Sequence, residues 1–202
     1  MIRRCVALVA LLPIVACSTP PPPGNASPSN AKATPVYNDK SGQLEQIVSD
    51  SNGDGKIDTR AFMEGRRLRR IEVDRNGDGT PDRFEYYGDR PPERVDPTSP
   101  AGRAEIERVE ESNGPDKQIT RREFYDAGEL ARVEDDSNND GRLDRWELYD
   151  RGILARIEMD LKGSGFPTRR LLYRRDGSID RVEIDPEGTG AWREAPPGAS
   201  PR

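Results

Sequence analysis

The stretch RREFYDAGELARVEDDSNNDGRLDRWELYDRGILARIEMD, residues 121–160, decides the fold. It contains one motif twice, Leu-Ala-Arg-Val/Ile-Glu, at 130–134 and 154–158. Complete or partial copies of this motif occur six times, at residues 44–47, 68–72, 106–110, 130–134, 154–158 and 179–183. An acidic, glycine-containing loop follows each copy, and these loops begin at positions 50, 74, 112, 136, 160 and 185. The body of the chain is therefore a repeat of about 24 residues, a length typical of one supersecondary unit.

A second short segment, often aromatic, follows each loop, and a glycine-containing turn joins it to the next copy. Such turns are Ala127-Gly128, Arg151-Gly152 and Asp176-Gly177. Asp-Gly between two β-prone runs is a strong hairpin signal. Both segments alternate with a period of two, which predicts strands. We therefore expect an all-β fold, an antiparallel meander of about six 24-residue β-hairpin repeats. All tight turns should lie at one edge and all acidic loops at the other.

One interval in the repeat is longer than the others, and we assign its extra residues to an enlarged turn over 89–103. The sequence leaves open whether the sheet is open, coiled or barrel-like. An exposed apolar face would favour closure or the pairing of two layers.

The alternation also predicts how side chains divide between the two faces of the sheet. Phe84 and Tyr86 share one face of their strand, and Ile71 and Val73 share one face of theirs. We expect a half-buried sheet whose second face carries ladders of Arg, Glu and Tyr. Because opposite charges there neutralise each other, we interpret that face as solvated surface in preference to a ligand surface.

Two loops carry a complete set of residues for a calcium ion, which takes about six to eight oxygen ligands. We number each loop from its first residue, so that Asp74 and Asp136 are position 1 and Glu85 and Glu147 are position 12. Glycine at position 6, Gly79 or Gly141, allows the sharp backbone turn. At position 7, Thr80 and Arg142 would contribute only their carbonyl groups. The predicted ligands are Asp74, Asn76, Asp78, Thr80, Asp82 and Glu85 in one loop, and Asp136, Asn138, Asp140, Arg142, Asp144 and Glu147 in the other.

A third loop matches everywhere except at position 12, where Ala61 replaces the acid. Its predicted ligands are Asp50, Asn52, Asp54, Lys56 and Asp58, with Lys56 again contributing its carbonyl. This loop should bind calcium more weakly. The loops that begin at Ser112, Asp160 and Asp185 have lost most of these residues, and we expect no calcium there.

The Asp-x-Asn-x-Asp-Gly core of these loops resembles the calcium loop of EF-hand proteins. An EF-hand needs a helix on each side, however, and the period-two segments between these loops do not fit helices. The loops are more similar to those of thrombospondin type 3 and dockerin repeats, without the cysteines of the former. The hairpin units resemble bacterial YD-type and MORN-type repeats. Calcium binding is the implied role, and the alternative is that the loops are Asx-rich turns without metal.

The N-terminus predicts export and a lipid anchor. Arg3 and Arg4 precede an apolar run that is too short to span a bilayer, as in a signal peptide. The run ends in Ile14-Val15-Ala16-Cys17, which resembles the bacterial lipobox and implies lipidation of Cys17. Ser18 follows the cysteine at the position where some lipoprotein families carry an Asp that retains them in the inner membrane, and this resemblance implies the outer membrane. We expect a signal peptide at 1–16, a lipid-anchored Pro/Ser-rich linker at 17–36, the repeat domain at 37–193 and a disordered tail at 194–202.

Composition excludes several classes of function. The chain has no histidine, which removes His-based catalysis and the usual zinc sites. Its net charge is −5, and loss of the two arginines in the signal peptide would make it −7, which argues against nucleic acid. We expect a non-catalytic calcium-binding envelope lipoprotein that serves as a binding or spacer module. The alternatives are a metal-independent module that binds an envelope protein or polysaccharide and, less favoured, a calcium-dependent hydrolase. No small-molecule substrate is evident.

Overall fold

The computed structural model describes residues 32–88, 105–113 and 117–196. The predicted signal peptide, Cys17 and the predicted enlarged turn at 89–103 lie outside the described residues. So do residues 197–202, most of the predicted tail.

The described residues form strands and no helices. The strands are β1 (Lys32–Tyr37), β2 (Leu44–Asp50), β3 (Thr59–Glu64), β4 (Arg67–Val73), β5 (Arg83–Tyr87), β6 (Ile106–Glu111), β7 (Arg121–Asp126), β8 (Glu129–Asp135), β9 (Arg145–Asp150), β10 (Ile153–Met159), β11 (Arg169–Tyr173), β12 (Ile179–Ile184) and β13 (Arg193–Glu194). The predicted repeat domain began at residue 37, whereas β1 already begins at Lys32, inside the predicted linker.

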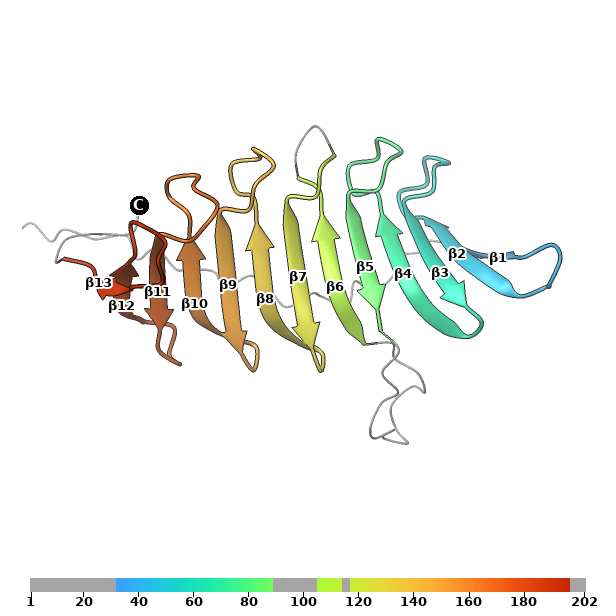
Figure 1. The fold of residues 1–202 in the computed structure, drawn as a ribbon. Coiled ribbons are helices and arrows are strands. Elements are labelled where there is room, and N and C mark those ends of the chain that lie inside the picture. The colour runs from blue at the N-terminus through green and yellow to red at the C-terminus, as the bar shows by residue number, and fades with distance from the viewer. Residues whose placement is uncertain (1–31, 89–104, 114–116, 197–202) are drawn as a thin grey trace, which may run out of the picture.

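The thirteen strands form one antiparallel sheet in which every strand pairs with its neighbours in the sequence. The prediction of an all-β meander of hairpin repeats is confirmed, and the question of closure is settled in favour of an open sheet. Figure 1 shows a single layer, with the predicted acidic loops along one edge and the tight turns along the other. In the turns at 127–128 and 151–152 both residues have positive φ, the geometry of a tight hairpin whose twist matches its strands.

The register determines which side chains share a face. Directly paired residues of antiparallel strands point to the same side of the sheet. Ile71 pairs with Glu85, Glu85 with Val109, and Val109 with Glu123. Ile and Val of one strand therefore lie beside Arg, Glu and Tyr of the next strand. We call this side the triad face, after the Arg-Glu-Tyr sets described below.

The opposite side, the arginine–aromatic face, alternates in the same way. Arg70 pairs with both Phe62 and Tyr86, and Arg108 pairs with both Tyr86 and Phe124. The guanidinium of Arg70 lies 4.4 Å from the centre of the Phe62 ring, within cation–π range. Arg108 over Tyr86 and Arg132 over Phe124 repeat this contact. Acidic residues two positions further along the same strands pair with these arginines, as Glu110 does with Arg108.

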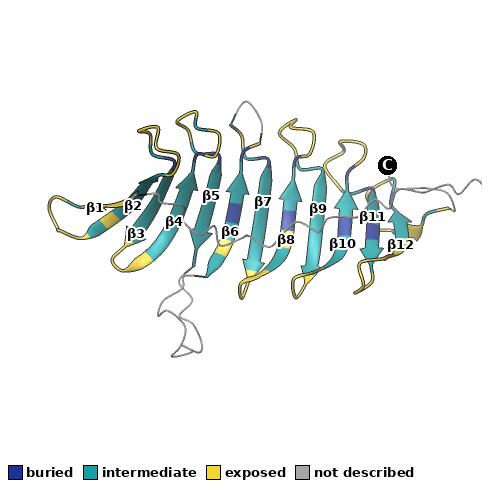
Figure 2. Cartoon of the chain, turned by 180° about the vertical axis from the view of Figure 1, so that it is seen from behind, coloured by how far each residue is buried: buried dark blue, intermediate teal, exposed yellow. Residues whose placement is uncertain are grey.

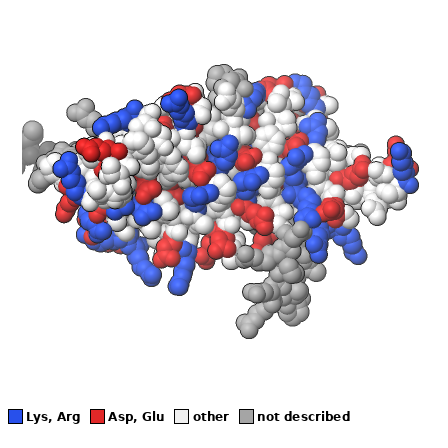
Figure 3. Space-filling view, in the orientation of Figure 1, with Lys and Arg blue, Asp and Glu red and all other residues white. Residues whose placement is uncertain are grey.

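The prediction of one apolar face and one charged face is thus wrong. Each strand has an apolar and a charged side, as the sequence indicates, but neighbouring strands turn their apolar sides to opposite faces. Both faces of the sheet are mixed, and Figure 3 shows cationic and anionic side chains interspersed with uncharged ones on one face. Because neither face is continuously apolar, the sheet needs no second layer to cover it.

The most buried apolar side chains form one row across the triad face. These are Val109, Val133, Ile157 and Leu171, with exposures of 0, 0, 7 and 4%. Figure 2 shows them as dark patches in the middle of β6, β8, β10 and β11. Val109 and Val133 are fully buried without a second layer because long Arg, Glu and Tyr side chains of the flanking strands cover them.

The two ends of the sheet are poorly suited to further strand pairing. Pro35 lies within β1 and has no N–H to donate, and β13 has only two residues. The described residues contain no helix of the length and apolar character that crossing a membrane requires.

If cross-strand cover creates the core, truncation of a central valine should destabilise the sheet as it would a conventional core. We expect Val133→Ala to lower the free energy of unfolding by about 1–3 kcal/mol in urea denaturation. Ile153→Ala, at a side chain that is 44% exposed, should cost less than about 0.5 kcal/mol. Equal effects of the two substitutions would show that the row is not a core.

Candidate metal-binding loops

The acidic loops share one backbone frame. The residue at loop position 9 donates its N–H to the strand that precedes the loop, as Asp82 does to Val73 and Asp144 does to Asp135. The first residue of the next loop then donates to position 9, as Asp160 does to Asp144. These bonds continue the sheet ladder into the bases of the loops and hold neighbouring loops in a common row.

The aspartate at loop position 1 closes its own loop. In the loop 74–82, Asp74 accepts the N–H of Gly77 on one oxygen at 2.8 Å and that of Gly79 on the other at 2.7 Å. Gly79 has φ +92°, a conformation that other residues rarely adopt. The bond from position 6 to position 1 is present in the loops of Asp50, Asp136, Asp160 and Asp185 as well. Five loops of unequal acidity therefore close in the same way.

Position 9 has a structural task that does not require an acid. Asp58 and Asp82 accept the N–H of position 2, from Ser51 and Arg75. In two other loops the hydroxyl oxygens of Thr120 and Thr168 accept the equivalent bond. The position-9 side chain is nearly buried in four of these loops, in Asp58, Asp82, Thr120 and Thr168. Closure of the loop and metal binding are thus separable roles of this position.

The remaining predicted ligands form short Asx turns. The side-chain oxygen at position 3 accepts the N–H of position 5, and the carboxylate at position 5 accepts that of position 7. These pairs are Asn52 with Asp54 and Asp54 with Lys56, Asn76 with Asp78 and Asp78 with Thr80, and Asn138 with Asp140 and Asp140 with Arg142. In all three loops predicted to bind calcium, the side chains at positions 1, 3, 5 and 9 therefore accept backbone N–H groups of their own loop.

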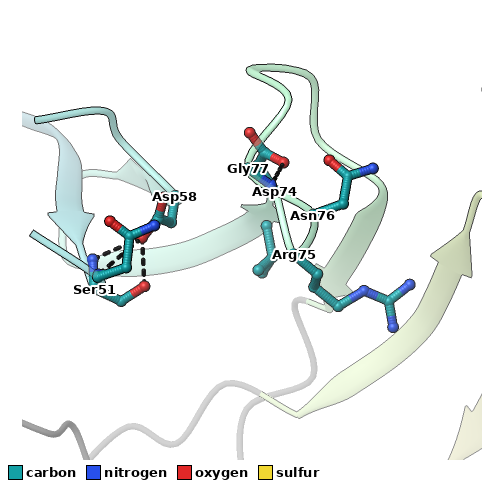
Figure 4. Close-up of a pocket in the computed structure, with 8 residues that line it drawn as sticks. Ser51, Asp58, Asp74, Arg75, Asn76 and Gly77 are labelled. Carbon is teal, nitrogen blue, oxygen red and sulfur yellow. Dashed lines mark hydrogen bonds between the residues drawn. The ribbon is translucent and has the colours of Figure 1, made fainter. Parts of the chain in front are cut away.

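Within the described residues, one loop gathers three carboxylates closely enough to hold a metal ion. The nearest ligand oxygens of Asp50, Asp54 and Asp58 lie within 4.8 Å of one another. The hydroxyl and N–H of Ser51 hold the pKa of Asp58 below its ordinary value, so this carboxylate is ionised at neutral pH. An open hollow of about 360 Å³ adjoins this loop, with the first residues of the loop 74–82 on its other side. Figure 4 shows Ser51 and Asp58 facing Asp74, Asn76 and Gly77 across it.

The loop 74–82 has a complete set of predicted calcium ligands in the sequence, but basic side chains already pair with two of its acids. Asp78 forms an ion pair with Lys117 of the next loop, which holds the pKa of Asp78 below its ordinary value. Asp82 pairs with Arg75 at 2.7 Å. In the loop 136–144, Asp144 accepts both the N–H and the hydroxyl of Ser137.

Glu85 and Glu147, the predicted position-12 ligands, lie in strands and not in loops. The carboxylate of Glu85 accepts bonds from Arg83 at 2.9 Å and from the hydroxyl of Tyr87 at 2.7 Å. Identical triads form in β7 and β9, with members Arg121, Glu123 and Tyr125, and Arg145, Glu147 and Tyr149. Burial, reinforced by the bond to glutamate, raises the pKa of each tyrosine far above its ordinary value, so the hydroxyl remains a donor. The triads hold these glutamates in the sheet.

The signal for these triads was present in the sequence as Arg-x-Glu-x-Tyr, because alternate residues of a strand share a face. We predicted that Arg, Glu and Tyr share one face of the strand, but we assigned the glutamate to the metal and did not predict its hydrogen bonds to the arginine and the tyrosine. Lys117 and Arg75 were also overlooked. Arg75 lies beside Asp74 in the sequence, whereas the position of Lys117 depends on how neighbouring loops align.

Comparisons with known proteins do not identify a family. No family model matches the chain, and no curated protein matches it. Among solved structures, one chain in the crystal structure of accessory secretory protein 1, 2 and 3 in Streptococcus pneumoniae is similar over 66% of this chain. The identity is 14% and the TM-score 0.29, and the match covers 20% of that chain. Similarity at this level carries no argument about function.

Position 9 offers a direct test of loop closure. Asp58→Thr should unfold close to the wild-type temperature in the presence of a chelator, because threonine supplies the same acceptor at Thr120 and Thr168. Asp58→Ala leaves the Ser51 N–H without its side-chain acceptor and should unfold at a clearly lower temperature. Thermal unfolding followed by circular dichroism measures both. Equal losses in the two variants would contradict the closing role.

Acidic pH should destabilise the folded state through the aspartates at the loop edge of the sheet. The pKa of Asp58 and of Asp78 is lowered by hydrogen bonds, and in Asp160 and Asp185 backbone N–H groups outweigh the upward effect of burial. A lowered pKa in the folded state gives stability that is complete above the ordinary value of 3.8 and is lost as pH falls through the lower folded value. With a chelator present, the urea midpoint should stay level near neutrality and fall below about pH 4. A urea midpoint that rises on acidification would contradict the prediction that these aspartates stabilise the fold in their ionised form.

Proposed function

We propose that this protein is a non-catalytic, calcium-binding lipoprotein of the cell envelope, with Cys17 as its lipid anchor and the repeat sheet as a binding or spacer module. The observation that supports calcium most directly is the convergence of Asp50, Asp54 and Asp58. Three ionised carboxylates at this separation repel one another, and a hard divalent cation that accepts oxygen ligands removes the repulsion.

In this proposal Asn52 and the Lys56 carbonyl complete a set of five protein ligands, and water fills the remaining positions. A site of this kind is weak, with a dissociation constant on the order of 0.1–1 mM, which suits calcium outside the cytoplasm. The loop 136–144 is a second candidate, with Asp136, Asn138, Asp140, Arg142 and Asp144 as ligands. We place the loop 74–82 last, because Lys117 and Arg75 already neutralise two of its acids.

The role we assign to calcium is structural reinforcement. Binding to the folded loop and not to the unfolded chain stabilises the folded state by mass action. A sheet of thirteen strands extends roughly 60 Å at about 4.8 Å per strand, which suits a spacer that holds a binding surface away from the membrane. We favour the outer membrane, as predicted from Ser18.

A second candidate function is a metal-independent module that binds an envelope protein or polysaccharide. The observation in its favour is loop closure. The loops of Asp160 and Asp185 lack most of the predicted ligands and still close through the same bond from position 6 to position 1. The loop frame therefore does not depend on a cation.

Calcium titration by calorimetry distinguishes the two candidates, using the chain produced from Ser18 onward. We expect at least one site, with Trp146 fluorescence reporting on the neighbouring loop 136–144. Asp54→Asn keeps an oxygen acceptor for the Lys56 N–H but removes one charge, and should weaken the Asp50 site by about tenfold or more. Asp176→Asn makes the same change in a turn at the opposite edge and should have no effect. No binding at several millimolar calcium would favour the metal-independent module.

A further inference from the structure

One cross-strand row of the triad face changes its chemistry along the sheet. In the middle of the sheet the row alternates arginine and acid, as Arg83, Glu111, Arg121, Asp135 and Arg145. These charges pair, since Arg83 contacts Glu111 and Arg121 contacts Asp135. Toward the C-terminal end, the row continues as Met159, Arg169, Ile184 and Arg193. The arginines continue, but apolar residues take the positions of the acids.

Arg169 has lost each acid that its equivalents use. Its cross-strand neighbours are Met159 and Ile184, and Leu171 occupies the place of the triad glutamate two residues along β11. Its Nε atom is buried and has no hydrogen-bond partner among the described residues, which is also true of Arg70, Arg108 and Arg156. Those three arginines form ion pairs with glutamates, whereas Arg169 forms none with the described residues. Native structures rarely leave a buried donor unpaired. In the same row Arg193 is exposed, and its cross-strand neighbour is Ile184.

We propose that Met159, Arg169, Ile184 and Arg193, which we call the C-terminal patch, bind an acidic segment of another protein in an extended conformation. Its carboxylates pair with Arg169 and Arg193, and its apolar side chains cover Met159 and Ile184. Alternate residues of an extended segment are about 7 Å apart, within reach of two long arginine side chains that stand two strands apart. Guanidinium groups beside apolar side chains are a composition favoured at protein interfaces.

The apolar half of the patch argues for a protein partner over a phosphate polymer. A polyphosphate would pair with the arginines but would leave Met159 and Ile184 without apolar cover. The inference names a partner class for the proposed binding module and so rests on that function. It does not rest on calcium, because none of the four residues belongs to an acidic loop.

The test is fluorescence anisotropy with a labelled short peptide of alternating glutamate and leucine, at low salt, with calcium and with a chelator. The peptide in which glutamine replaces glutamate, and a labelled polyphosphate, serve as ligand controls. We expect the acidic peptide to bind, and Arg169→Gln combined with Arg193→Gln to weaken binding by about tenfold or more. Arg175→Gln removes the same charge from an 82% exposed side chain at the turn edge and should leave binding unchanged.

Hydrogen exchange of the full chain provides a second measurement, since bound peptide should protect β11 to β13 and not β5 to β7. No binding by the wild type, equal binding by the double variant, or tighter binding of polyphosphate would overturn the proposal. Peptide binding that is unchanged by chelator supports the patch even where the calorimetric calcium titration shows no site. Calcium binding without peptide binding leaves the calcium site intact and removes the patch.

Discussion

A single-layer sheet must bury its apolar side chains against neighbours on the same face, because no second layer covers them. Pairing Ile71, Val109 and Val133 with glutamates of the intervening strands meets this constraint. The aliphatic parts of Arg and the rings of Tyr cover the small β-branched residues, while their polar ends remain solvated or paired. The most buried row of the protein is therefore flanked by charges, and the abundance of charged residues in the sequence is compatible with a folded sheet.

The same constraint explains why Glu85 and Glu147 belong to the sheet triads and not to the metal-binding loops. A carboxylate at this position serves either a calcium ion in the loop or the Arg-Glu-Tyr triad on the sheet. In the sheet Glu85 accepts one hydrogen bond from the guanidinium of Arg83 and one from the hydroxyl of Tyr87, both strengthened by the charge of the carboxylate, and it contributes to covering the central row. Because alternate residues of a strand share a face, Arg83 and Tyr87 lie on the same face as Glu85, and this favours the triad over a calcium ion in the loop.

Much of the fold followed from local signals in the sequence. Period-two alternation, the turns at Ala127-Gly128 and Arg151-Gly152, and the 24-residue repeat were sufficient for the meander and for the separation of loops from turns. Register was not, because it depends on which residues of neighbouring strands pair, and a shift by one position exchanges the faces. The two-face prediction failed for that reason. The loops show the same division: the turns closed by the side chains at positions 1, 3 and 5 follow from the Asp- and Asn-rich sequence, whereas the contact between Lys117 and Asp78, residues 39 positions apart, depends on how neighbouring loops align.

Differences among the repeats connect the Arg-Glu-Tyr triads of the sheet with the candidate calcium site in the loops. Strand β3 carries Ala61 where β5, β7 and β9 carry the triad glutamate, so this end of the sheet lacks the Arg-Glu-Tyr interactions. The loop that precedes β3 is the one in which Asp50, Asp54 and Asp58 converge. Ala61 therefore has two consequences: the loop 50–58 has no acid at position 12, and β3 has no triad glutamate. A cation bound there would reinforce the sheet next to a strand that lacks the triad interactions, and a modest affinity would suffice because the loop already closes through Asp50 and Gly55.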